Sequence, residues 1–169
     1  MPSSNYYLYL DATSAKANTW NVWNNTSPSS SVLTLGNDGG VNGSGSTYVA
    51  YCFADVEGYS KFGSYTGNGS ADGPFVYTGF RPAFVLRKCS GATGDWFLID
   101  ATRSPHNVSL LRLNANTSDA ELSGANSDID ILSNGFKIRA ASTIGVNQSG
   151  QPHIYMAFAE NPFKNALAR

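Results

Sequence analysis

A stretch without charge, Ser46–Ala54, constrains the fold of this chain more than any other part of the sequence. It reads Ser-Thr-Tyr-Val-Ala-Tyr-Cys-Phe-Ala, and Tyr, Val and Phe favour β-strands. Because side chains alternate between the two faces of a strand, Val49, Tyr51 and Phe53 would share one face. The opposite face would carry no charge either. We therefore expect a central strand that is covered on both sides.

The same pattern occurs again near the end of the chain. Val41-Asn42-x-Ser44-Gly45 leads into the first stretch, and Val146-Asn147-x-Ser149-Gly150 leads into His153–Ala159 at the same internal spacing. Phe53 then aligns with Phe158. The repeat predicts an internal pseudo-duplication in which these two Phe side chains occupy equivalent core positions.

A shorter match lies upstream of each copy. Leu8-Tyr-Leu-Asp11-Ala-Thr13 resembles Phe97-Leu-Ile-Asp100-Ala-Thr102. Asp and Thr side chains commonly accept hydrogen bonds from backbone N–H groups in turns. We therefore interpret both Asp-Ala-Thr sequences as turn caps at strand ends.

The rest of the chain has the pattern of short strands joined by turns rich in Gly, Asn and Ser. No segment keeps a helical period over three turns, and the Gly-rich, aromatic segment Tyr59–Tyr77 predicts short strands with tight turns. The fold class that follows is all-β: an antiparallel two-sheet β-sandwich or jelly roll. Further strands are expected at Tyr6–Leu10, Ser31–Leu35, Ala83–Lys88, Asp95–Ile99 and Phe136–Arg139, whereas Val108–Leu113 fits a strand or one short turn of helix. Trp20 and Val22 have the spacing of a strand, and Ser133-Asn-Gly135 predicts a turn.

Length and composition narrow the possibilities further. With 169 residues, the chain is expected to form one β-sandwich domain over residues 1–169, with loose ends at 1–5 and 164–169. Only 14% of its residues are charged and its net charge is -1, which argues against sequence-independent binding of nucleic acid. No apolar run is long enough to span a membrane, and the first residues lack a signal-peptide pattern. We expect Cys52 and Cys89 to be free, buried thiols.

Five phrases of the sequence are distinctive in combination: Tyr48–Ala54, Gly58–Gly69, Gly79–Val85, Leu132–Lys137 and Ala157–Phe163. Together they resemble a domain of uncharacterised function found in proteins of tailed bacteriophages, many from marine hosts. In that family, the phrases lie in the C-terminal region of large virion proteins that are tail-fibre-like or capsid-associated, with a fold related to concanavalin-A-like jelly rolls. The resemblance implies a virion structural or host-recognition role and identifies no catalytic residue.

Aromatic side chains beside loops rich in Gly and Asn are candidates for ligand binding. An aromatic face can stack on the apolar face of a sugar ring. Trp20, Tyr59 and Tyr77 are candidates for this role, and packing in the core is the alternative for each of them. Long loops at Gly36–Gly45, Asn116–Ser127 and Thr143–Gln151 are expected to carry recognition, with the turn Tyr65–Phe75 beside them. The predicted ligand-binding residues are Trp23, Tyr65, Asn68, Asp72, Asn116 and Asn147.

Catalytic and metal chemistry find little support in the sequence. Asp55-x-Glu57 resembles the paired carboxylates of glycosidases, but Gly58 ends the segment at once, so we interpret the two acids as solvated. His106 and His153 are far apart in the sequence and the cysteines form no metal-binding pair. We expect no catalytic residue, no metal ligand and no cofactor. Calcium bound through Asp38, Asn42 or Asp72 is the alternative that stays open.

The sequence therefore predicts a non-enzymatic virion structural protein of a bacteriophage, in a tail fibre or on the capsid surface. Its expected partners are other virion proteins and host-surface glycans, and it would form a homo-oligomer, a trimer first of all. It would be assembled in the bacterial cytoplasm, without inserting into a membrane or binding nucleic acid. The alternatives are a cellular lectin-like carbohydrate-binding module and a jelly-roll glycoside hydrolase or lyase.

Overall fold

The computed structural model describes residues 5–124, 129–141 and 145–162. By its contacts the chain divides into two compact units, Met1–Leu8 with Lys16–Phe53 and Tyr9–Ala15 with Ala54–Arg169. The predicted sandwich lies in the second unit, and one domain over residues 1–169 stays a prediction. Of the ends predicted to be loose, only Asn5 is described, and its side chain donates to Asn25 Oδ1 at 2.6 Å.

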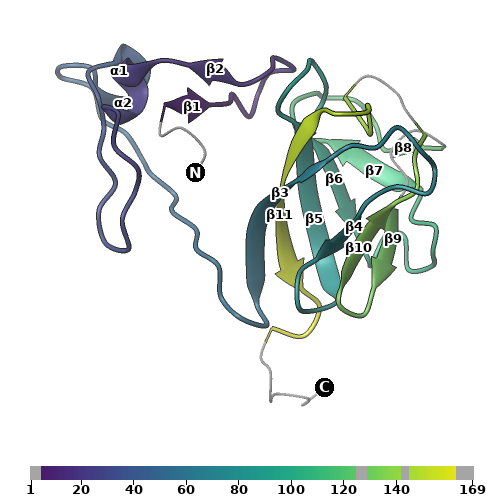
Figure 1. Cartoon of the computed structure of the whole chain (residues 1–169). Coiled ribbons are helices and arrows are strands. Elements are labelled where there is room, and N and C mark those ends of the chain that lie inside the picture. The colour runs from purple at the N-terminus through teal and green to yellow at the C-terminus, as the bar shows by residue number, and fades with distance from the viewer. Residues whose placement is uncertain (1–4, 125–128, 142–144, 163–169) are drawn as a thin grey trace. The chain divides into compact units, whose positions relative to one another are not determined.

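The first unit contains little regular structure. Strands β1 (Tyr6–Tyr7) and β2 (Ala17–Asn18) pair antiparallel, and two single-turn helices follow, α1 (Trp20–Trp23) and α2 (Gly39–Asn42) (Figure 1). Thr19 caps α1 and Asp38 caps α2, each accepting a backbone N–H two residues ahead. The strand expected at Ser31–Leu35 does not form.

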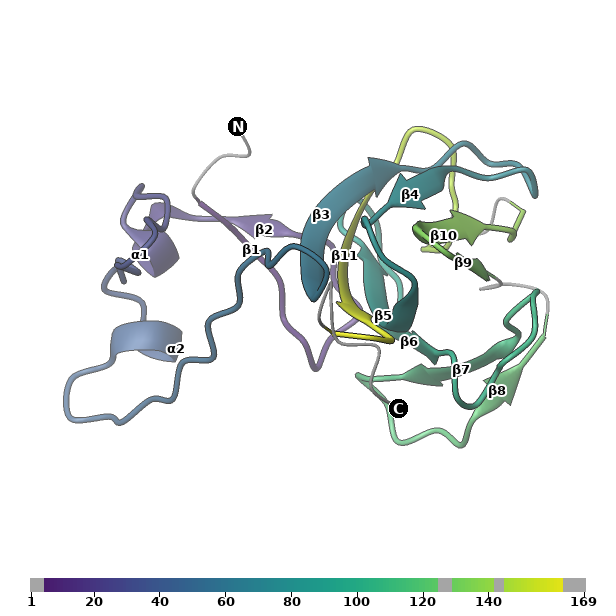
Figure 2. The same ribbon diagram turned by 90° about the horizontal axis from the view of Figure 1, so that it is seen from below.

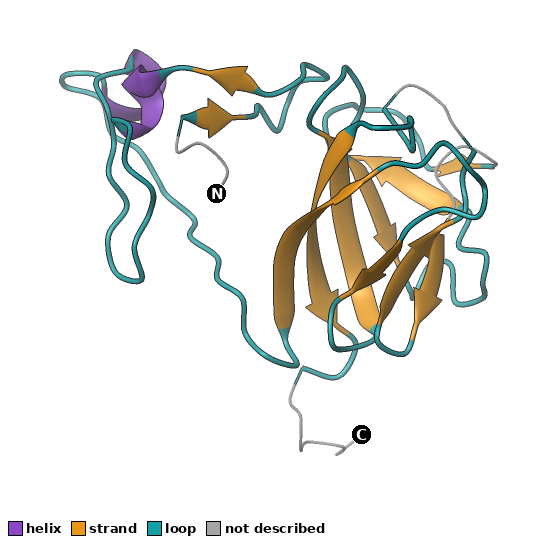
Figure 3. Ribbon diagram, in the orientation of Figure 1, coloured by secondary structure: helices purple, strands orange, loops and turns teal. Residues whose placement is uncertain are grey.

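The second unit consists of two antiparallel sheets, as the all-β prediction requires (Figure 3). In the longer sheet the order is β3-β11-β5-β6-β7-β8, and in the shorter sheet it is β4-β10-β9. Figure 2 shows the longer sheet curving around the shorter one. The strands are β3 (Ser60–Thr66), β4 (Phe75–Tyr77), β5 (Pro82–Cys89), β6 (Phe97–Asp100), β7 (Leu111–Asn114), β8 (Leu122–Ser123), β9 (Ile129–Leu132), β10 (Gly135–Ile138) and β11 (Pro152–Ala159).

Strands β5 and β11 lie at the centre of the longer sheet. β11 pairs with β3 on one side and with β5 on the other, so that His153 lies opposite Tyr65 and Cys89. Alternate residues of β11 are buried, beginning with His153. The predicted strand His153–Ala159 is therefore confirmed as a central strand, in agreement with its apolar sequence on both faces.

The core lies between the two sheets. Val85 and Ile99 of the longer sheet are fully buried, as are Phe136 and Ile138 of the shorter one. Aromatic rings meet edge to face across this layer, with Phe136 and Tyr155 centroids 5.3 Å apart. The cluster consists of Val76, Phe80, Val85, Phe97, Ile99, Ile129, Ile131, Phe136, Ile138, Ala140, Val146, Tyr155 and Ala157.

The segment Tyr9–Ala15 covers one end of the outer face of the longer sheet. Lys88 Nζ donates to the carbonyl oxygens of Thr13 and Gly94, at 3.0 and 2.6 Å. Trp96 Nε1 donates to the carbonyl oxygen of Tyr9 at 2.8 Å. Lys88 is thus fully buried with hydrogen-bond partners, and this burial lowers the pKa of its ammonium group.

The expectation for Ser46–Ala54 is wrong. The whole stretch is irregular and exposed, with Val49 at 79%, Tyr51 at 84% and Phe53 at 61% of full exposure. A sequence that favours strands gains stability only where a neighbouring strand and a covering layer exist. Among the described residues, no hydrogen bond joins the backbone of Val49–Cys52 to another segment. The predicted pseudo-duplication is therefore not matched in structure. Phe53 is exposed and Phe158 is half-buried outside the core cluster, so the two do not occupy equivalent core positions.

Two smaller expectations are confirmed in part. Both cysteines are free, but Cys89 is buried and Cys52 is exposed because its stretch is exposed. Asp100 caps its turn by accepting the backbone N–H groups of Thr102 and Arg103, at 3.1 and 2.8 Å. In the first Asp-Ala-Thr sequence, Asp11–Thr13, the carbonyl oxygen of Thr13 accepts a hydrogen bond from Lys88 Nζ.

Neither helix of the described chain has the length to cross a membrane. α1 and α2 contain four residues each, whereas a membrane-spanning helix needs about 20.

Candidate functional site

The structure brings together three of the predicted ligand-binding residues, Asn68, Asp72 and Asn147. Asn147 is fully buried, and its Nδ2 donates to Asn68 Oδ1, Ser70 O and Ala140 O at 3.2, 2.8 and 2.9 Å. Its Oδ1 accepts the backbone N–H of Asn68 at 3.1 Å. Asn147 therefore holds the loop after β3 in place, and its full burial keeps its amide away from a ligand at the surface.

Asn68 and Asp72 complete the same loop. Asn68 Nδ2 donates to the carbonyl oxygen of Asp72 at 2.9 Å, and its Oδ1 accepts the N–H of Ser70. The Asp72 carboxylate is exposed and pairs with Lys137 Nζ at 2.5 Å, which lowers the pKa of Asp72. The loop is thus stabilised by its own polar side chains.

Tyr65 faces the interior of the sandwich. Its ring stacks on the imidazole of His153, with centroids 4.8 Å apart and planes 6° from parallel. Burial raises the pKa of the Tyr65 hydroxyl, against the opposing effect of the nearby Arg87 guanidinium. Tyr65 is therefore a packing residue, partly buried against the core, with one face of its ring covered by His153.

The remaining two predicted residues also have structural partners. Trp23 belongs to the first unit, where its Nε1 donates to the carbonyl oxygen of Tyr6 at 3.0 Å. Asn116 accepts the N–H of Trp96 and donates to Asp95 Oδ1, at 2.8 and 2.9 Å. Asn116 thus fixes the chain after β7 to the start of β6.

The predicted recognition loops are only partly loops. Gly36–Gly45 contains α2, and Asn116–Ser127 contains β8 within its described part. Of Thr143–Gln151, the described residues begin with three buried ones, Gly145, Val146 and Asn147. Val146 packs in the core, and the amide of Asn147 anchors a neighbouring loop. These roles could not be predicted from the sequence, because polar and apolar residues do not alternate in this segment.

A different set of residues forms a polar hollow on the second unit, with a volume of about 380 Å³. One wall comes from the turn that precedes β3, and the other from the end of β4 and the residues after it. This polar hollow is lined by Asp55, Val56, Glu57, Gly58, Ser60, Lys61, Tyr77, Thr78 and Gly79.

The first wall is a tight turn held by backbone hydrogen bonds. Val56 and Ser60 exchange two bonds, at 3.0 and 2.9 Å, and Ser60 Oγ donates to Ala54 O at 2.9 Å. Gly58 lies between them at a φ of +72°, a conformation that glycine adopts without steric cost. The turn therefore has a defined shape that presents Asp55, Glu57 and Lys61 together.

The first wall also carries an ion pair. Asp55 Oδ2 pairs with Lys61 Nζ, and Asp55 Oδ1 accepts the N–H of Phe62 at 2.8 Å. The Lys61 hydrogen bond lowers the pKa of Asp55, and Asp55 raises the pKa of Lys61. Both groups stay ionised around neutral pH, while 46% of the Asp55 side chain and 40% of the Lys61 side chain remain exposed.

The second wall presents an exposed aromatic ring. Tyr77 is 64% exposed, whereas its neighbours Val76 and Thr78 are buried. Thr78 Oγ1 donates to the carbonyl oxygen of Phe80 at 2.6 Å, and Thr78 and Gly79 both donate to the carbonyl oxygen of Asn134. The backbone beside Tyr77 is thus held in place, and the exposed ring can serve as a stacking surface.

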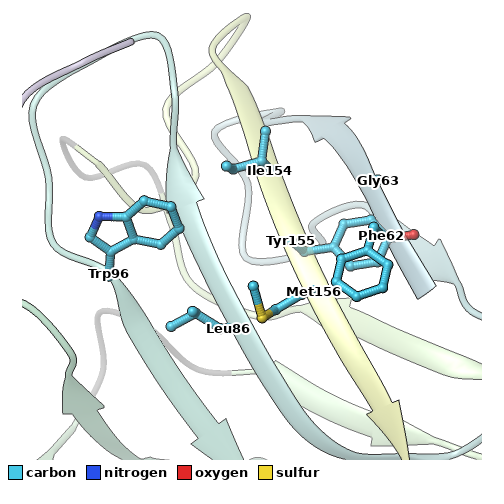
Figure 4. A pocket seen from close by; sticks show the side chains of 7 residues that line it. All are labelled: Phe62, Gly63, Leu86, Trp96, Ile154, Tyr155 and Met156. Carbon is cyan, nitrogen blue, oxygen red and sulfur yellow. The ribbon is translucent and has the colours of Figure 1, made fainter. Parts of the chain in front are cut away.

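A second, apolar hollow of about 260 Å³ lies on the outer face of the longer sheet. Figure 4 shows Leu86 of β5 with Ile154 and Met156 of β11, and Trp96 beside them. Phe62, Gly63 and Tyr155 complete the lining. Few polar atoms are available there to orient a ligand, so the polar hollow is the better candidate for recognition.

The structure tests the calcium alternative through the residues named for it. Asp38 accepts the N–H of Gly40, and Asn42 donates to the carbonyl oxygen of Gly36. Asp72 pairs with Lys137 and belongs to the other unit. Within the described residues, no group of three or more His, Cys, Asp or Glu side chains could hold a metal ion.

The sequence indicates some residues of the polar hollow one by one, without showing that they lie together. Tyr77 is one of its candidate stacking aromatics, and Asp55-x-Glu57 resembles a catalytic pair of carboxylates. Lys61 and Gly79 received no functional interpretation. The available signal was the short spacing between Asp55 and Lys61 across Gly58, which is typical of a turn that brings opposite charges together.

The chain belongs to a family of protein domains described as "domain of unknown function (DUF7483)", whose model matches residues 1–162. That description states no activity, ligand or partner. No curated protein and no solved structure matches the chain.

Proposed function

We propose that this chain is a non-enzymatic structural protein of a bacteriophage virion. It acts as a tail-fibre or capsid-surface module that contacts host-surface glycans and neighbouring virion subunits, after assembly in the bacterial cytoplasm. The proposal combines the resemblance of five sequence phrases to phage virion domains with the chemistry of the polar hollow.

One observation carries the glycan part of this proposal. The polar hollow places the exposed ring of Tyr77 opposite a fixed carboxylate and a fixed ammonium group, Asp55 and Lys61. A sugar presents an apolar ring face together with hydroxyl groups that both donate and accept hydrogen bonds. The hollow matches both parts, because the ring can stack and the ion pair retains donors and acceptors.

The scaffold suits a module that displays a surface. Two antiparallel sheets around one core are compatible with a concanavalin-A-like jelly roll, the finer architecture that we propose. In such a scaffold, surface turns can vary while the core persists. The turn at Asp55–Ser60, held by backbone bonds, is a feature of this type.

A binding role fits the charges of the hollow better than hydrolysis does. A glycosidase needs a carboxylic acid that keeps its proton near neutral pH. Asp55 instead has a lowered pKa because Lys61 and the N–H of Phe62 stabilise its charged form. This favours the non-enzymatic interpretation over a jelly-roll hydrolase or lyase.

Contacts between subunits are supported by a different part of the chain. The stretch Ser46–Phe53 exposes Val49, Tyr51 and Phe53 and carries no charge. Large exposed apolar groups in one segment often mark an interaction surface. We propose that this stretch takes part in a homo-oligomer in the particle, with a trimer as the preferred order. Light scattering that compares the wild-type chain with Tyr51→Ser would test this.

The experiment for glycan recognition uses a multivalent display, because single weak sites gain strongly from repetition. Beads carrying the full chain should adhere to host cells, and Tyr77→Ala should weaken each site by about two- to tenfold, the typical worth of an aromatic contact. Phe75→Ala is the matched control, since it removes an exposed ring from the same strand outside the hollow. Equal adhesion of the wild type and Tyr77→Ala would contradict the proposal.

Two observations separate this proposal from its alternatives. Cryo-EM that places the chain in an intact particle would exclude a cellular lectin-like module, as phage structural genes beside its gene would. Release of reducing sugars from host polysaccharide by the purified chain would instead favour a glycoside hydrolase.

A further inference from the structure

We infer that the polar hollow selects uncharged, hydroxyl-rich sugars and rejects acidic ones such as hexuronic or sialic acids. This inference rests on the proposed function, because it concerns the ligand class of the same site. It follows from the charges that line the hollow and from the hydrogen bonds that already occupy them.

The lining carries more negative than positive charge. The residues of charged type in the lining are Asp55, Glu57 and Lys61. The lining residues, all of which are described, thus have a formal net charge of -1. An acidic sugar that entered would meet the carboxylate of Asp55, which has the same charge.

The one basic group of the lining is already committed. Lys61 Nζ pairs with Asp55 Oδ2, so its charge is largely neutralised within the hollow. A ligand carboxylate would have to compete with Asp55 for this ammonium group. Because the pair favours the ionised form of both partners, the competition persists across the neutral pH range.

Hydroxyl groups meet no such obstacle. Each carboxylate oxygen accepts more than one hydrogen bond, and an ammonium group has three donors. Asp55 Oδ1 accepts the N–H of Phe62, and Oδ2 accepts Lys61, which leaves lone pairs for a sugar hydroxyl to donate to. The remaining N–H groups of Lys61 can donate to a neighbouring sugar oxygen. The ion pair therefore presents an acceptor beside a donor, the pattern that two adjacent hydroxyl groups complement.

Tyr77 supplies the uncharged part of the site. Its exposed ring lies beside Gly79, where a Cβ atom would come within 3.7 Å of the Tyr77 hydroxyl oxygen. The absence of a side chain at Gly79 keeps that edge of the ring open. Stacking on this ring would contribute equally to neutral and acidic sugars, so the discrimination comes from the charged wall.

The test measures binding of the full chain, displayed on beads, to paired oligosaccharides that differ only in the C6 group, hexose against hexuronic acid. The wild type should bind at least one neutral member about tenfold more strongly than its acidic counterpart, the size expected for one like-charge contact near a protein surface. Asp55→Asn, which frees Lys61, should narrow this ratio to about threefold or less. Tyr77→Ser should weaken both members while keeping the ratio.

Asp72→Asn is the matched control, because it breaks an exposed Asp–Lys pair outside the hollow and should leave the ratio unchanged. Thermal unfolding of each variant confirms that it is folded. Equal or stronger binding of the acidic members by the wild type would overturn the inference while supporting the proposed function. Binding of neither member of any pair would contradict the proposed function itself.

Discussion

Two stretches of this chain share one sequence pattern and have opposite environments. His153–Ala159 forms most of β11, which pairs on both sides in the longer sheet. Ser46–Ala54 has the same preceding Val-Asn-x-Ser-Gly sequence and the same Phe-Ala ending, yet it is irregular and exposed along its whole length. The difference teaches that an apolar alternating sequence permits a strand, while the neighbours decide whether it becomes one.

The two stretches are similar in sequence but differ in the strands that lie beside them. β11 has β3 and β5 beside it, and Phe136 of the shorter sheet contacts Tyr155 above it. The first copy has no comparable pairing among the described residues at Val49–Cys52. Three comparisons between aligned positions can break or sharpen this account.

The largest expected effect is at the aligned Phe residues. Phe158 is half-buried, and its ring lies 6.0 Å from those of Tyr59 and Phe62 and 5.8 Å from that of Phe84. Phe158→Ala should therefore lower the free energy of unfolding by about 2–4 kcal/mol. Phe53→Ala should change it by about 0.5 kcal/mol or less, since that ring is mostly exposed. Chemical denaturation of both variants checks this, and equal losses would restore the predicted equivalence.

The aligned Asn residues should differ by a smaller amount. Asn147 is buried, and its side-chain amide makes four hydrogen bonds, to Asn68, Ser70 and Ala140. Asn147→Ala should cost about 2–3 kcal/mol, because it leaves buried backbone and side-chain groups without partners. Asn42 is exposed and donates to Gly36 O, so Asn42→Ala should cost less than about 1 kcal/mol. A larger loss at Asn42 than at Asn147 would reverse the comparison.

The third effect depends on pH and arises at His153, which aligns with Tyr48. Burial, with a contribution from Arg87, lowers the pKa of His153 to about 4. The unfolded chain then binds more protons than the folded chain below about pH 6.5, so stability is complete above that pH and falls as the pH drops towards 4. The loss between pH 7 and pH 5 should be about 2 kcal/mol.

His153→Phe should remove most of this pH dependence while keeping a ring on Tyr65. The exposed His106 supplies the control, and His106→Gln should keep the dependence of the wild type. The carboxylates with lowered pKa values, Asp55, Asp72 and Asp100, lose their contribution only at lower pH. A wild-type stability that stays constant from pH 7 to pH 5 would contradict a neutral, buried His153.

Much of the fold could be predicted from the sequence. The strands at 83–88 and 153–159 and the hairpin around Ser133-Asn-Gly135 form as expected, because their apolar residues alternate and their turns contain Gly or Asn. The errors lie where a partner decides the outcome. Among the described residues, no hydrogen bond joins the backbone of Val49–Cys52 to a neighbouring strand, and Trp20–Trp23 forms a capped helical turn in place of a strand.

The site was harder to predict for a related reason. The predicted ligand-binding residues are polar or aromatic and lie near loops, but the amides of Asn116 and Asn147 anchor those loops. Residues that bind a ligand and residues that anchor a loop are of the same types. Only the hydrogen-bond distances in the structure distinguish the two. The polar hollow depends on segments separated along the chain, the turn before β3 and the end of β4, which no local pattern connects.

Amide hydrogen exchange is the measurement that tests the central comparison most directly, because it reports backbone hydrogen bonding at each position. At a concentration where light scattering shows a monomer, the amides of Ile154–Ala157 should be strongly protected. Those of the aligned Val49–Cys52 should exchange at nearly the rate of an unstructured peptide. Comparable protection of both stretches would contradict the account and would show that the first copy also forms a paired strand.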